Sequence, residues 1–218
     1  YAGKNNVPVT FNNPCVIPPS NICTENSIYS IVVTLPPAPG GYRVAYVRCC
    51  RGPNINNLVN PDDTGLTLTV NIPGVENNAY QNSSPRFNNY PPMLLCNNDQ
   101  LVFNHSASDP DGDQLVYSLS TPYRGGTPNN PMPTPTPSPP YVPITWLGGF
   151  SQTQPLGPGS SIAINSTTGV LTASPNLTGR YVVGIRVDEY RNGVLISSMI
   201  RDFIFRVFFG RCTGSCWS

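Results

Sequence analysis

An acidic run is the sharpest candidate for chemistry in the chain. Asp109, Asp111 and Asp113 lie within five residues, and Gly112 between them permits a tight turn. Three carboxylates this close repel one another unless a cation neutralises them. Ca²⁺ binds oxygen ligands and tolerates the irregular geometry of a loop. The spacing therefore predicts a Ca²⁺ site. It is not an EF-hand, because the glycine falls at the fourth place and no glutamate follows at the twelfth.

Residues from elsewhere in the chain would have to complete this site. Asp188 and Glu189 lie at the end of the predicted strand 179–189 and are the candidate distal ligands. The alternative is a solvated acidic turn, in which the aspartate side chains accept hydrogen bonds from nearby backbone N–H groups. Extracellular Ca²⁺ modules bind the ion at about 10⁻⁴–10⁻³ M. A titration of Ca²⁺ against thermal unfolding separates the two interpretations.

The seven cysteines indicate an oxidising, extracytoplasmic compartment, because the chain is also rich in proline and poor in charge. The disulfide candidates are Cys15, Cys23, Cys49, Cys50, Cys96, Cys212 and Cys216. Cys49 and Cys50 are adjacent at a strand end, where neighbours point to opposite faces, so we expect them to have different partners. The first two cysteines could close one loop and the last two the tail, which leaves Cys96 for Cys49 or Cys50. Because seven is odd, at least one cysteine is free or bonded outside the chain.

Two further chemistries are disfavoured. A zinc site lacks support because there is no CxxC pair and His105 is the single histidine. A hydrolase would recruit His105 with a serine and an aspartate, but no GxSxG sequence is present. A histidine near an acidic loop is more often a hydrogen-bonded structural residue. We therefore expect a chain that is not an enzyme.

A glycan-binding surface is the main alternative to a structural role. Arginine and aromatic residues alternate from Tyr42 to Arg51, and Trp146 and Trp217 could serve as further stacking platforms. Exposed rings stack on sugars, and arginine binds carboxylates in a two-point geometry. The competing interpretation is that these rings belong to the core and that the arginine stems cover it. A glycan array separates the two.

The elements that position these residues are predicted to be strands. Only 11% of the 218 residues are charged, and 26 are proline, which excludes an all-helical protein. The net charge of +1 gives no electrostatic case for nucleic acid. No apolar stretch is long enough to span a bilayer. The hydrophobic share of 39% is enough for a folded core and argues against disorder.

Alternating apolar residues predict strands in two groups. The predicted strands are 27–35, 41–50, 65–72, 100–104, 114–120, 144–147, 160–165, 169–173, 179–189 and 193–209. An Asn-Gly pair at Asn192 predicts a hairpin between the last two. The proline-rich stretch 128–143 is expected to be extended, either as a stiff loop across the sandwich or as a docking peptide.

These strands predict an all-β fold of two tandem β-sandwich modules of the immunoglobulin, PKD or cadherin kind. Residues 1–84 would form the first module and residues 85–210 the second, followed by an irregular tail at 211–218. The first module has only three clear strands, too few to close a sandwich. Its remaining strands would lie upstream, come from a partner chain, or be irregular.

Several short motifs occur in a characteristic order along residues 12–209. They are Arg48-Cys49-Cys50-Arg51, Ile55-Asn56-Asn57-Leu58-Val59-Asn60-Pro61, Asn82-Ser83-Ser84-Pro85, Phe87-Asn88-Asn89-Tyr90-Pro91-Pro92, His105-Ser106-Ala107, Gly169-Val170-Leu171-Thr172, Asp188-Glu189-Tyr190-Arg191-Asn192-Gly193 and Arg201-Asp202-Phe203. Together they resemble the N-terminal modules of large Bacteroidota secreted surface proteins. Such proteins carry PKD-like repeats and a gliding-motility-associated C-terminal sorting domain. This chain has Gln81, Ser120 and Arg186 where the family often has cysteine.

The resemblance implies export by the type IX secretion route and an extracellular, cell-surface location. It also implies a structural or adhesive role in an adhesin, appendage or filament. The expected partners are other domains of the same long polypeptide, neighbouring subunits or surface glycans. It supplies no catalytic residue. A carbohydrate-binding module of a secreted protein remains the alternative function.

Overall fold

The computed structural model describes residues 2–7, 24–76 and 80–209. One turn of 3-10 helix lies at Pro61–Asp63, and the other regular elements of this part are strands. The strands are β1 (Ala2–Asn6), β2 (Glu25–Ile28), β3 (Tyr42–Arg48), β4 (Leu66–Ile72), β5 (Arg86–Phe87), β6 (Leu94–Cys96), β7 (Leu101–Asn104), β8 (Ala107–Ser108), β9 (Gln114–Ser120), β10 (Ser161–Ile164), β11 (Val170–Ser174), β12 (Gly179–Arg191) and β13 (Val194–Phe208). The all-β prediction is confirmed.

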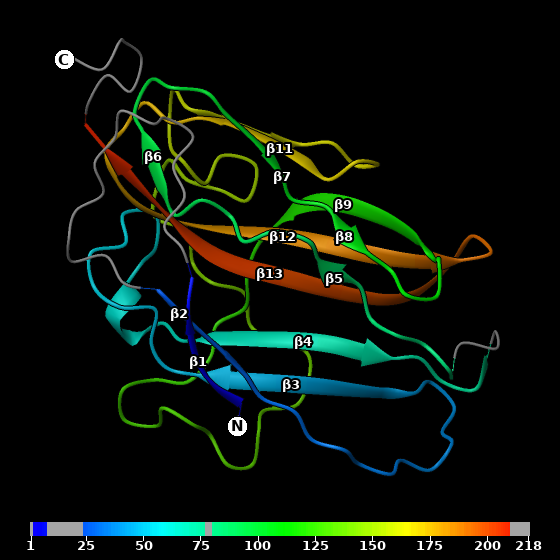
Figure 1. The fold of residues 1–218 in the computed structure, drawn as a ribbon. Helices are drawn as coiled ribbons and strands as arrows, with labels where there is room; N and C mark the ends of the chain where they lie inside the picture. The colour runs from blue at the N-terminus through cyan, green and yellow to red at the C-terminus, as the bar shows by residue number, and fades with distance from the viewer. Residues whose placement is uncertain (1, 8–23, 77–79, 210–218) are drawn as a thin grey trace.

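Two of the sheets face each other as a sandwich (Figure 1). One has the strand order β6-β13-β12-β9 and the other β10-β11-β7. Their neighbouring strands are antiparallel, except that β6 runs parallel to β13. The buried side chains of this core are Leu95, Leu101, Leu156, Leu171, Ala173, Tyr181, Val183, Ile185, Phe205 and Val207. Removing their apolar surface from water is the main contribution to stability, as in other sandwiches.

The central strand β12 is buried on both of its faces. Tyr181, Val183 and Ile185 point into the sandwich core, as their alternation in the sequence predicts. Val182 points the other way, yet it is fully buried with Ile55 in a second apolar cluster. That cluster also joins Leu58 and Ile144, with Trp146 and Ile204 packed against it. Segments from the N-terminal part of the chain therefore cover the outer face of the larger sheet.

A buried asparagine fastens this cover to the sheet. Asn57 donates from Nδ2 to the carbonyl oxygens of Pro155 (2.9 Å) and Val182 (2.8 Å). Its Oδ1 accepts from the Val182 N–H at 3.0 Å. All polar atoms of this fully buried amide are thereby satisfied, which removes the cost of burying it. Apolar contacts and hydrogen bonds cross the predicted module boundary at residue 84, and the division into two modules stays a prediction.

The hairpin β12–β13 has the turn that its Asn-Gly pair predicts. Asn192 and Gly193 have φ of 53° and 78°, the positive values that a tight hairpin turn requires. The register of the two strands shifts between Glu189 and Tyr190, where one extra residue lies in β13. Such bulges re-aim side chains at the end of a sheet. Here the bulge lies beside the carboxylate that the sequence singled out.

The N-terminal part contains fewer regular strands. β3 and β4 form an antiparallel hairpin beside β13, and β1 pairs with β2 (Figure 1). The predicted strand 27–35 is wrong beyond Ile28, where β2 ends. Ile31 and Val32 are 84% and 98% exposed. β-branched alternation marks a segment that can be a strand, but a neighbouring strand must supply the hydrogen bonds.

Other differences from the predicted strands have similar causes. Residues 144–147 form one isolated bridge, between Trp146 and Leu58, because the neighbouring chain runs alongside them only briefly. β1 and β6 were not predicted, since they are short and their pairing partners lie far away in the sequence. The proline-rich stretch 128–143 has no strand and is mostly exposed.

The described cysteines depart from the predicted pairing. Cys49 and Cys50 form a disulfide with each other, so the expectation of different partners is wrong. Both residues follow Arg48, where β3 ends, so the alternation of strand side chains no longer governs them. Cys96 is also disulfide-bonded, but it cannot pair with Cys49 or Cys50. The candidates Cys15, Cys23, Cys212 and Cys216 lie outside the described residues.

Candidate functional site

The acidic loop lies between β8 and β9 and meets the end of β12. Asp109 Oδ1 accepts hydrogen bonds from the backbone N–H groups of Asp111 and Asp113, each at 3.0 Å. Gly112 has a φ of +81°, which a residue with a side chain would rarely adopt. This part of the loop is therefore an acidic turn in which an aspartate side chain accepts hydrogen bonds from the loop's own backbone, as the alternative interpretation of the sequence expects. The turn leaves the second carboxylate oxygen of Asp109 pointing elsewhere.

That oxygen meets Glu189, which arrives from the far end of β12. Carboxylate oxygens of Asp109, Asp113 and Glu189 lie within 4.8 Å of one another. Glu189 is fully buried. Its two oxygens and Asp109 Oδ2 have no hydrogen-bond partner among the described residues. Buried polar atoms are paired almost without exception, so three orphaned acceptors at one point indicate a missing donor or cation.

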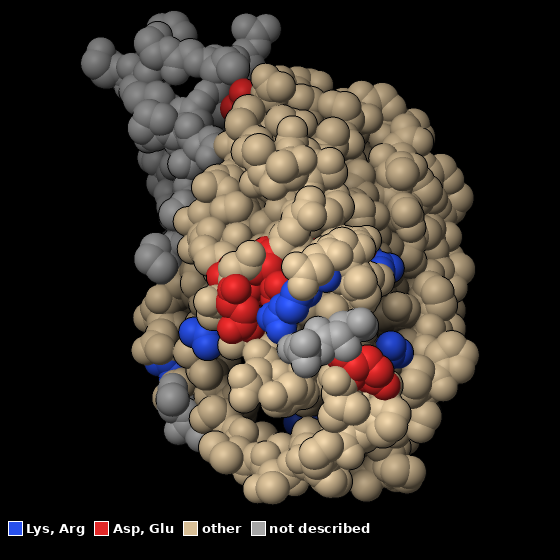
Figure 2. All heavy atoms as spheres, turned by 90° about the vertical axis from the view of Figure 1, so that its right-hand side faces the viewer, with Lys and Arg blue, Asp and Glu red and all other residues tan. Residues whose placement is uncertain are grey.

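Arg191 supplies part of the missing positive charge. Its Nε and Nη2 donate to the two oxygens of Asp113 at 2.8 and 2.5 Å, a two-point ion pair. Nη2 also donates to Asn82 Oδ1 at 2.8 Å. Figure 2 shows acidic and basic side chains side by side on this face of the molecule. The guanidinium thus pairs with Asp113 and also feels the charge of Glu189, whereas Glu189 and Asp109 keep oxygens without a hydrogen-bond partner among the described residues.

Two of the predicted ligands, Asp111 and Asp188, do not belong to the cluster. Asp111 accepts from the backbone N–H of Ser83 at 2.6 Å and lies 3.6 Å from Arg191 Nη2. Asp188 is the sequence neighbour of Glu189 and therefore lies on the opposite face of β12. Its carboxylate accepts from Arg186 Nε at 2.6 Å and from the Ser198 hydroxyl. The structure therefore brings together Asp109, Asp113 and Glu189 out of the five.

The electrostatics of the cluster follow from this packing. Burial raises the pKa of Glu189 to about 7, and the charges of Asp109 and Asp113 add to the rise; the nearby Asn82 amide, although it lies outside hydrogen-bond geometry, opposes it. The hydrogen bond from Arg191 lowers the pKa of Asp113, with burial acting against it. The Asp113 carboxyl is thus held in its ionised form, whereas the Glu189 carboxyl resists ionisation. A bound cation would reverse the second effect by favouring the charged form of Glu189.

Asn82 is the part of this site that sequence reasoning missed. It lies 27 residues before Asp109 in the chain, and its Nδ2 is buried without a hydrogen-bond partner among the described residues. The amide can present either its oxygen or its nitrogen to the cluster, since the two ends are interchangeable by rotation. In the sequence, the only sign that Asn82 has a role is that it begins one of the motifs of the resemblance. Its distance along the chain from Asp109 gives no sign that the two residues meet.

His105, for which the sequence disfavours a hydrolase role, has no catalytic partner among the described residues. His105 is fully buried among Phe87, Phe103 and Phe203, with ring centroids 5.0 to 5.6 Å away. Neither ring nitrogen has a hydrogen-bond partner among the described residues. Burial, together with the charge of Arg201, lowers its pKa to about 3. This imidazole is neutral and packs as an aromatic side chain, without the serine and aspartate contacts of a triad.

Of the residues considered for sugar stacking, one is packed against the core and another remains partly exposed. Trp146 packs against the second apolar cluster and donates from Nε1 to Thr121 Oγ1 at 3.2 Å. Its ring is therefore part of the core, and Trp217 lies outside the described residues. Tyr46 remains partly exposed, with the Arg48 guanidinium 4.8 Å from its ring centre.

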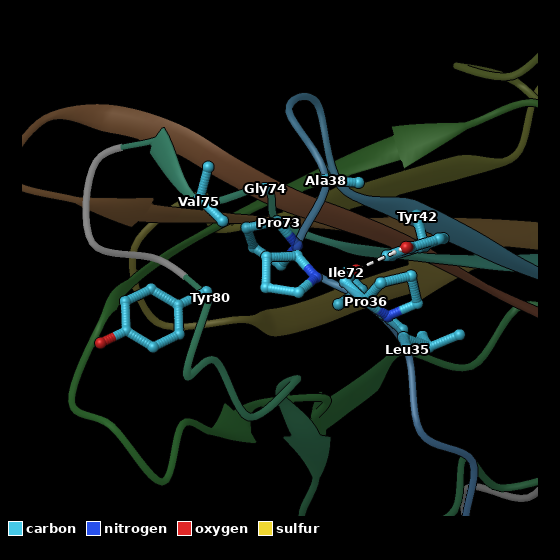
Figure 3. A pocket seen from close by; sticks show the side chains of 10 residues that line it. Leu35, Pro36, Ala38, Tyr42, Ile72, Pro73, Gly74, Val75 and Tyr80 are labelled. Atoms are coloured by element: carbon cyan, nitrogen blue, oxygen red, sulfur yellow. Dashed lines mark hydrogen bonds between the residues drawn. The ribbon is translucent and has the colours of Figure 1, made fainter.

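An apolar pocket of about 370 Å³ lies at the end of the β3–β4 hairpin. Figure 3 shows Pro36, Pro73 and Val75 around it, with Tyr80 at one side. The Tyr42 hydroxyl donates to the Pro36 carbonyl oxygen at 2.5 Å, which closes this end of the loop. None of the described residues that line the pocket is charged, so they offer shape without a charged group that could orient a polar ligand.

Comparisons with known proteins give one distant similarity. The chain is 24% identical over 181 residues to Integrin beta-like protein A of Dictyostelium discoideum. The match covers 80% of this chain but only 7% of the length of that protein. No family model matches the chain. No solved structure matches it either. Among the described residues, no helix is long and apolar enough to cross a membrane.

Proposed function

We propose that this chain is a structural and adhesive β-module of an extracellular bacterial surface protein, stiffened at one end by Ca²⁺. The observation that carries the metal part is the set of orphaned oxygens on Asp109 and Glu189. Leaving an ionised carboxylate buried and unpaired costs several kcal/mol, so a site of this composition calls for a cation. Ca²⁺ fits best because the donors are all oxygen and are held by an irregular loop.

The residues that would hold the ion are Asp109, Asp113 and Glu189, with Asn82 able to add its amide oxygen. Ca²⁺ takes six to eight oxygen ligands, so waters or backbone carbonyls would complete the shell. The ion would supply positive charge where Arg191 does not reach. Because Asn82 lies in the connection between β4 and β5, the ion would tie this connection to the end of β12. The expected result is a stiffer joint between the N-terminal part and the sandwich.

Three observations support the adhesive part of the proposal. The fold is all-β with an interlocked core, as load-bearing extracellular modules require. The relative that it matches is named an integrin beta-like protein. The ordered motifs resemble Bacteroidota surface proteins, from which we take the cell-surface location and type IX export. The partners would be other domains of the same polypeptide or neighbouring subunits, and the module would carry out no catalysis.

A melting experiment tests the metal part. At pH 7.5, 10 mM Ca²⁺ should raise the melting temperature of the chelator-treated protein, and Mg²⁺ should do so less. Binding at about 10⁻⁴–10⁻³ M corresponds to about 1.4–2.7 kcal/mol at this concentration. For a chain of this length that is roughly 3 to 10 °C. Glu189→Gln should lose the response.

Asp188→Asn is the matched control, because it removes a neighbouring carboxylate that points away from the cluster. It should lower stability slightly and keep the Ca²⁺ response. No response in the unmodified protein, or an equal loss in both variants, would refute the site. The adhesive part has its own measurement. Beads coated with folded protein should attach to surfaces or to one another more than beads coated with unfolded protein, and equal attachment would contradict it.

A further inference from the structure

A second polar site lies at the opposite end of β13 from the acidic loop. It is a pocket of about 710 Å³, and its walls include Arg180, Arg201 and Arg206 together with Tyr90 and Phe203. We call these five residues the arginine pocket. Half-buried arginines beside aromatic rings form a surface with strong donors and apolar faces. Each of the three guanidinium groups carries a positive charge, so the source of the compensating negative charge decides what binds here.

Two of these arginines face each other across the sheet. Arg180 on β12 is the direct cross-strand partner of Arg206 on β13. Like charges directly opposite each other destabilise a strand pair. Consistent with this, burial and the charge of Arg206 lower the pKa of Arg180. Arg180 Nε is buried with no hydrogen-bond partner among the described residues. Arg180 Nη1 donates to the Pro53 carbonyl oxygen at 2.9 Å, which satisfies one donor but leaves the two like charges unneutralised. A shared anion would relieve this repulsion.

The chain itself has no carboxylate for this pair. All eleven Asp and Glu residues lie in the part of the chain that the structure describes. The ion pairs found there use Lys4, Arg51, Arg186 and Arg191 as cations, and none involves the arginine pocket. Asp202, the acid that also lines this hollow, pairs with Arg51, and both side chains are buried. Among the described residues the three guanidinium groups thus have no carboxylate partner, which leaves them available to an external anion.

At the other end of the pocket, neighbouring groups hold the Arg201 side chain in one position. Its Nη1 donates to the Asn89 carbonyl oxygen at 2.7 Å. Its guanidinium lies 4.6 Å from the ring centre of Phe87 and 5.7 Å from that of Tyr90. Burial lowers its pKa to about 10, so the group is still charged at neutral pH. A fixed guanidinium loses little freedom when it binds an anion, which favours binding.

A peptide strand is a poor occupant for this place. The edge of β13 beside the pocket is occupied by β6 at residues 206–208. Further along, the Arg51 side chain reaches Asp202, and the Ser197 hydroxyl donates to the Asn71 carbonyl oxygen at 3.2 Å. An added strand needs a continuous free edge. Recognition here therefore uses side chains, and the ligand must offer anions to arginines and an apolar face to rings.

We propose that the arginine pocket binds an acidic saccharide, with carboxylate-bearing sugar units placed against the Arg180–Arg206 pair and against Arg201. Arg201 and Arg206 are five residues apart on β13, roughly 16 Å, and their side chains leave opposite faces of the strand, so a ligand that meets both must bring at least two charged units around its edge. The ring of Tyr90, which is 55% exposed and has the Arg201 guanidinium 5.7 Å from its centre, offers a stacking face beside Arg201. This ligand class deepens the proposed adhesive function and rests on it. It is independent of the Ca²⁺ site.

Calorimetry with oligogalacturonate, neutral galactose oligosaccharide of equal length and a polyglutamate peptide tests the proposal on the whole chain. The acidic saccharide should bind, and added salt should weaken binding by screening the charges. Arg206→Gln and Arg201→Gln should each reduce affinity by about tenfold, as expected for loss of one charge-assisted contact. Arg43→Gln is the matched control, since Arg43 is exposed and lies outside the pocket.

Arg206→Gln has a second readout that a merely structural arginine would not give. Because it removes a like-charge pair, its melting temperature should stay the same or rise while affinity falls. Equal binding of neutral and acidic saccharides, binding of polyglutamate alone, or unchanged affinity in both pocket variants would overturn the proposal. If coated beads still attach to surfaces in that case, the adhesive function stands without this ligand. If wild-type beads do not attach at all, the function itself has failed.

Discussion

Replacing Glu189 by glutamine should remove a pH dependence that the metal-free protein would otherwise show. Glu189 is fully buried, and its pKa is raised from 4.5 to about 7, mainly by burial. Between these two values the folded protein binds more protons than the unfolded chain. The stabilising contribution of Glu189 is therefore complete below about pH 4.5, is lost as pH rises through the window, and is absent above about pH 7.

The size of the effect follows from the same numbers. At 1.36 kcal/mol per pKa unit, the difference between 4.5 and about 7 corresponds to a loss on the order of 3 kcal/mol. Glutamine carries no charge at any of these pH values, so the variant should lack this loss. At pH 7.5 in chelator the variant should be more stable than the wild type, by less than the full amount because its amide is buried without partners.

Urea unfolding at several pH values measures this, and the difference between wild type and variant is the quantity to follow. Other groups titrate in the same range in both proteins, and the difference cancels them. Addition of 10 mM Ca²⁺ at pH 7.5 should then stabilise the wild type alone and narrow the gap. A constant difference from pH 4.5 to 7 would refute the account of Glu189, and an equal Ca²⁺ gain in both proteins would refute its role as a ligand.

Two other substitutions test the buried polar groups of the core. Arg51→Met should cost about 3–5 kcal/mol in urea unfolding, because it leaves Asp202 buried without its ion-pair partner; replacing both residues by apolar side chains should recover much of that loss. If the single variant were as stable as wild type, the pair would not be buried in solution. His105→Phe should be tolerated, since neither ring nitrogen has a hydrogen-bond partner among the described residues. The folded-state pKa of His105 is lowered from 6.5 to about 3, so its contribution is full above pH 6.5 and is lost as pH falls toward 3. The phenylalanine variant should therefore be less sensitive to acid in that window, and identical acid sensitivity would count against the burial of the imidazole.

The strands with strong local signals were predictable because their information is local. Alternation located β3, β4, β9 and β12 to within one or two residues, and the Asn-Gly pair located the hairpin turn. Segment 29–35 carries the same pattern yet forms no strand, since strand formation also needs a partner that the pattern does not name. The short β1 and β6 show the converse case, in which a distant partner makes a strand from a weak signal.

The acidic site was half predictable for a similar reason. The spacing of Asp109 and Asp113 is readable because a single loop holds both residues. The structure brings the distal candidate Glu189 to the loop, but Asp188 was offered with equal weight, since the sequence does not say which face of β12 meets the loop. The register of β12 against β9 and β13 decides it, together with the bulge after Glu189. Asn82 reaches the cluster only through the path of the connection between β4 and β5.

Composition and alternation by themselves determined that this chain is built of strands with a large apolar core and carries a carboxylate-rich turn. Those properties depend on neighbours in the sequence. Tertiary structure decided which carboxylates converge and that Arg180 faces Arg206. It also left the arginine pocket without an acidic partner. The balance of charge at a site depends on every chain segment that reaches it. Which segments meet there is decided by the fold and is not visible in the order of residues.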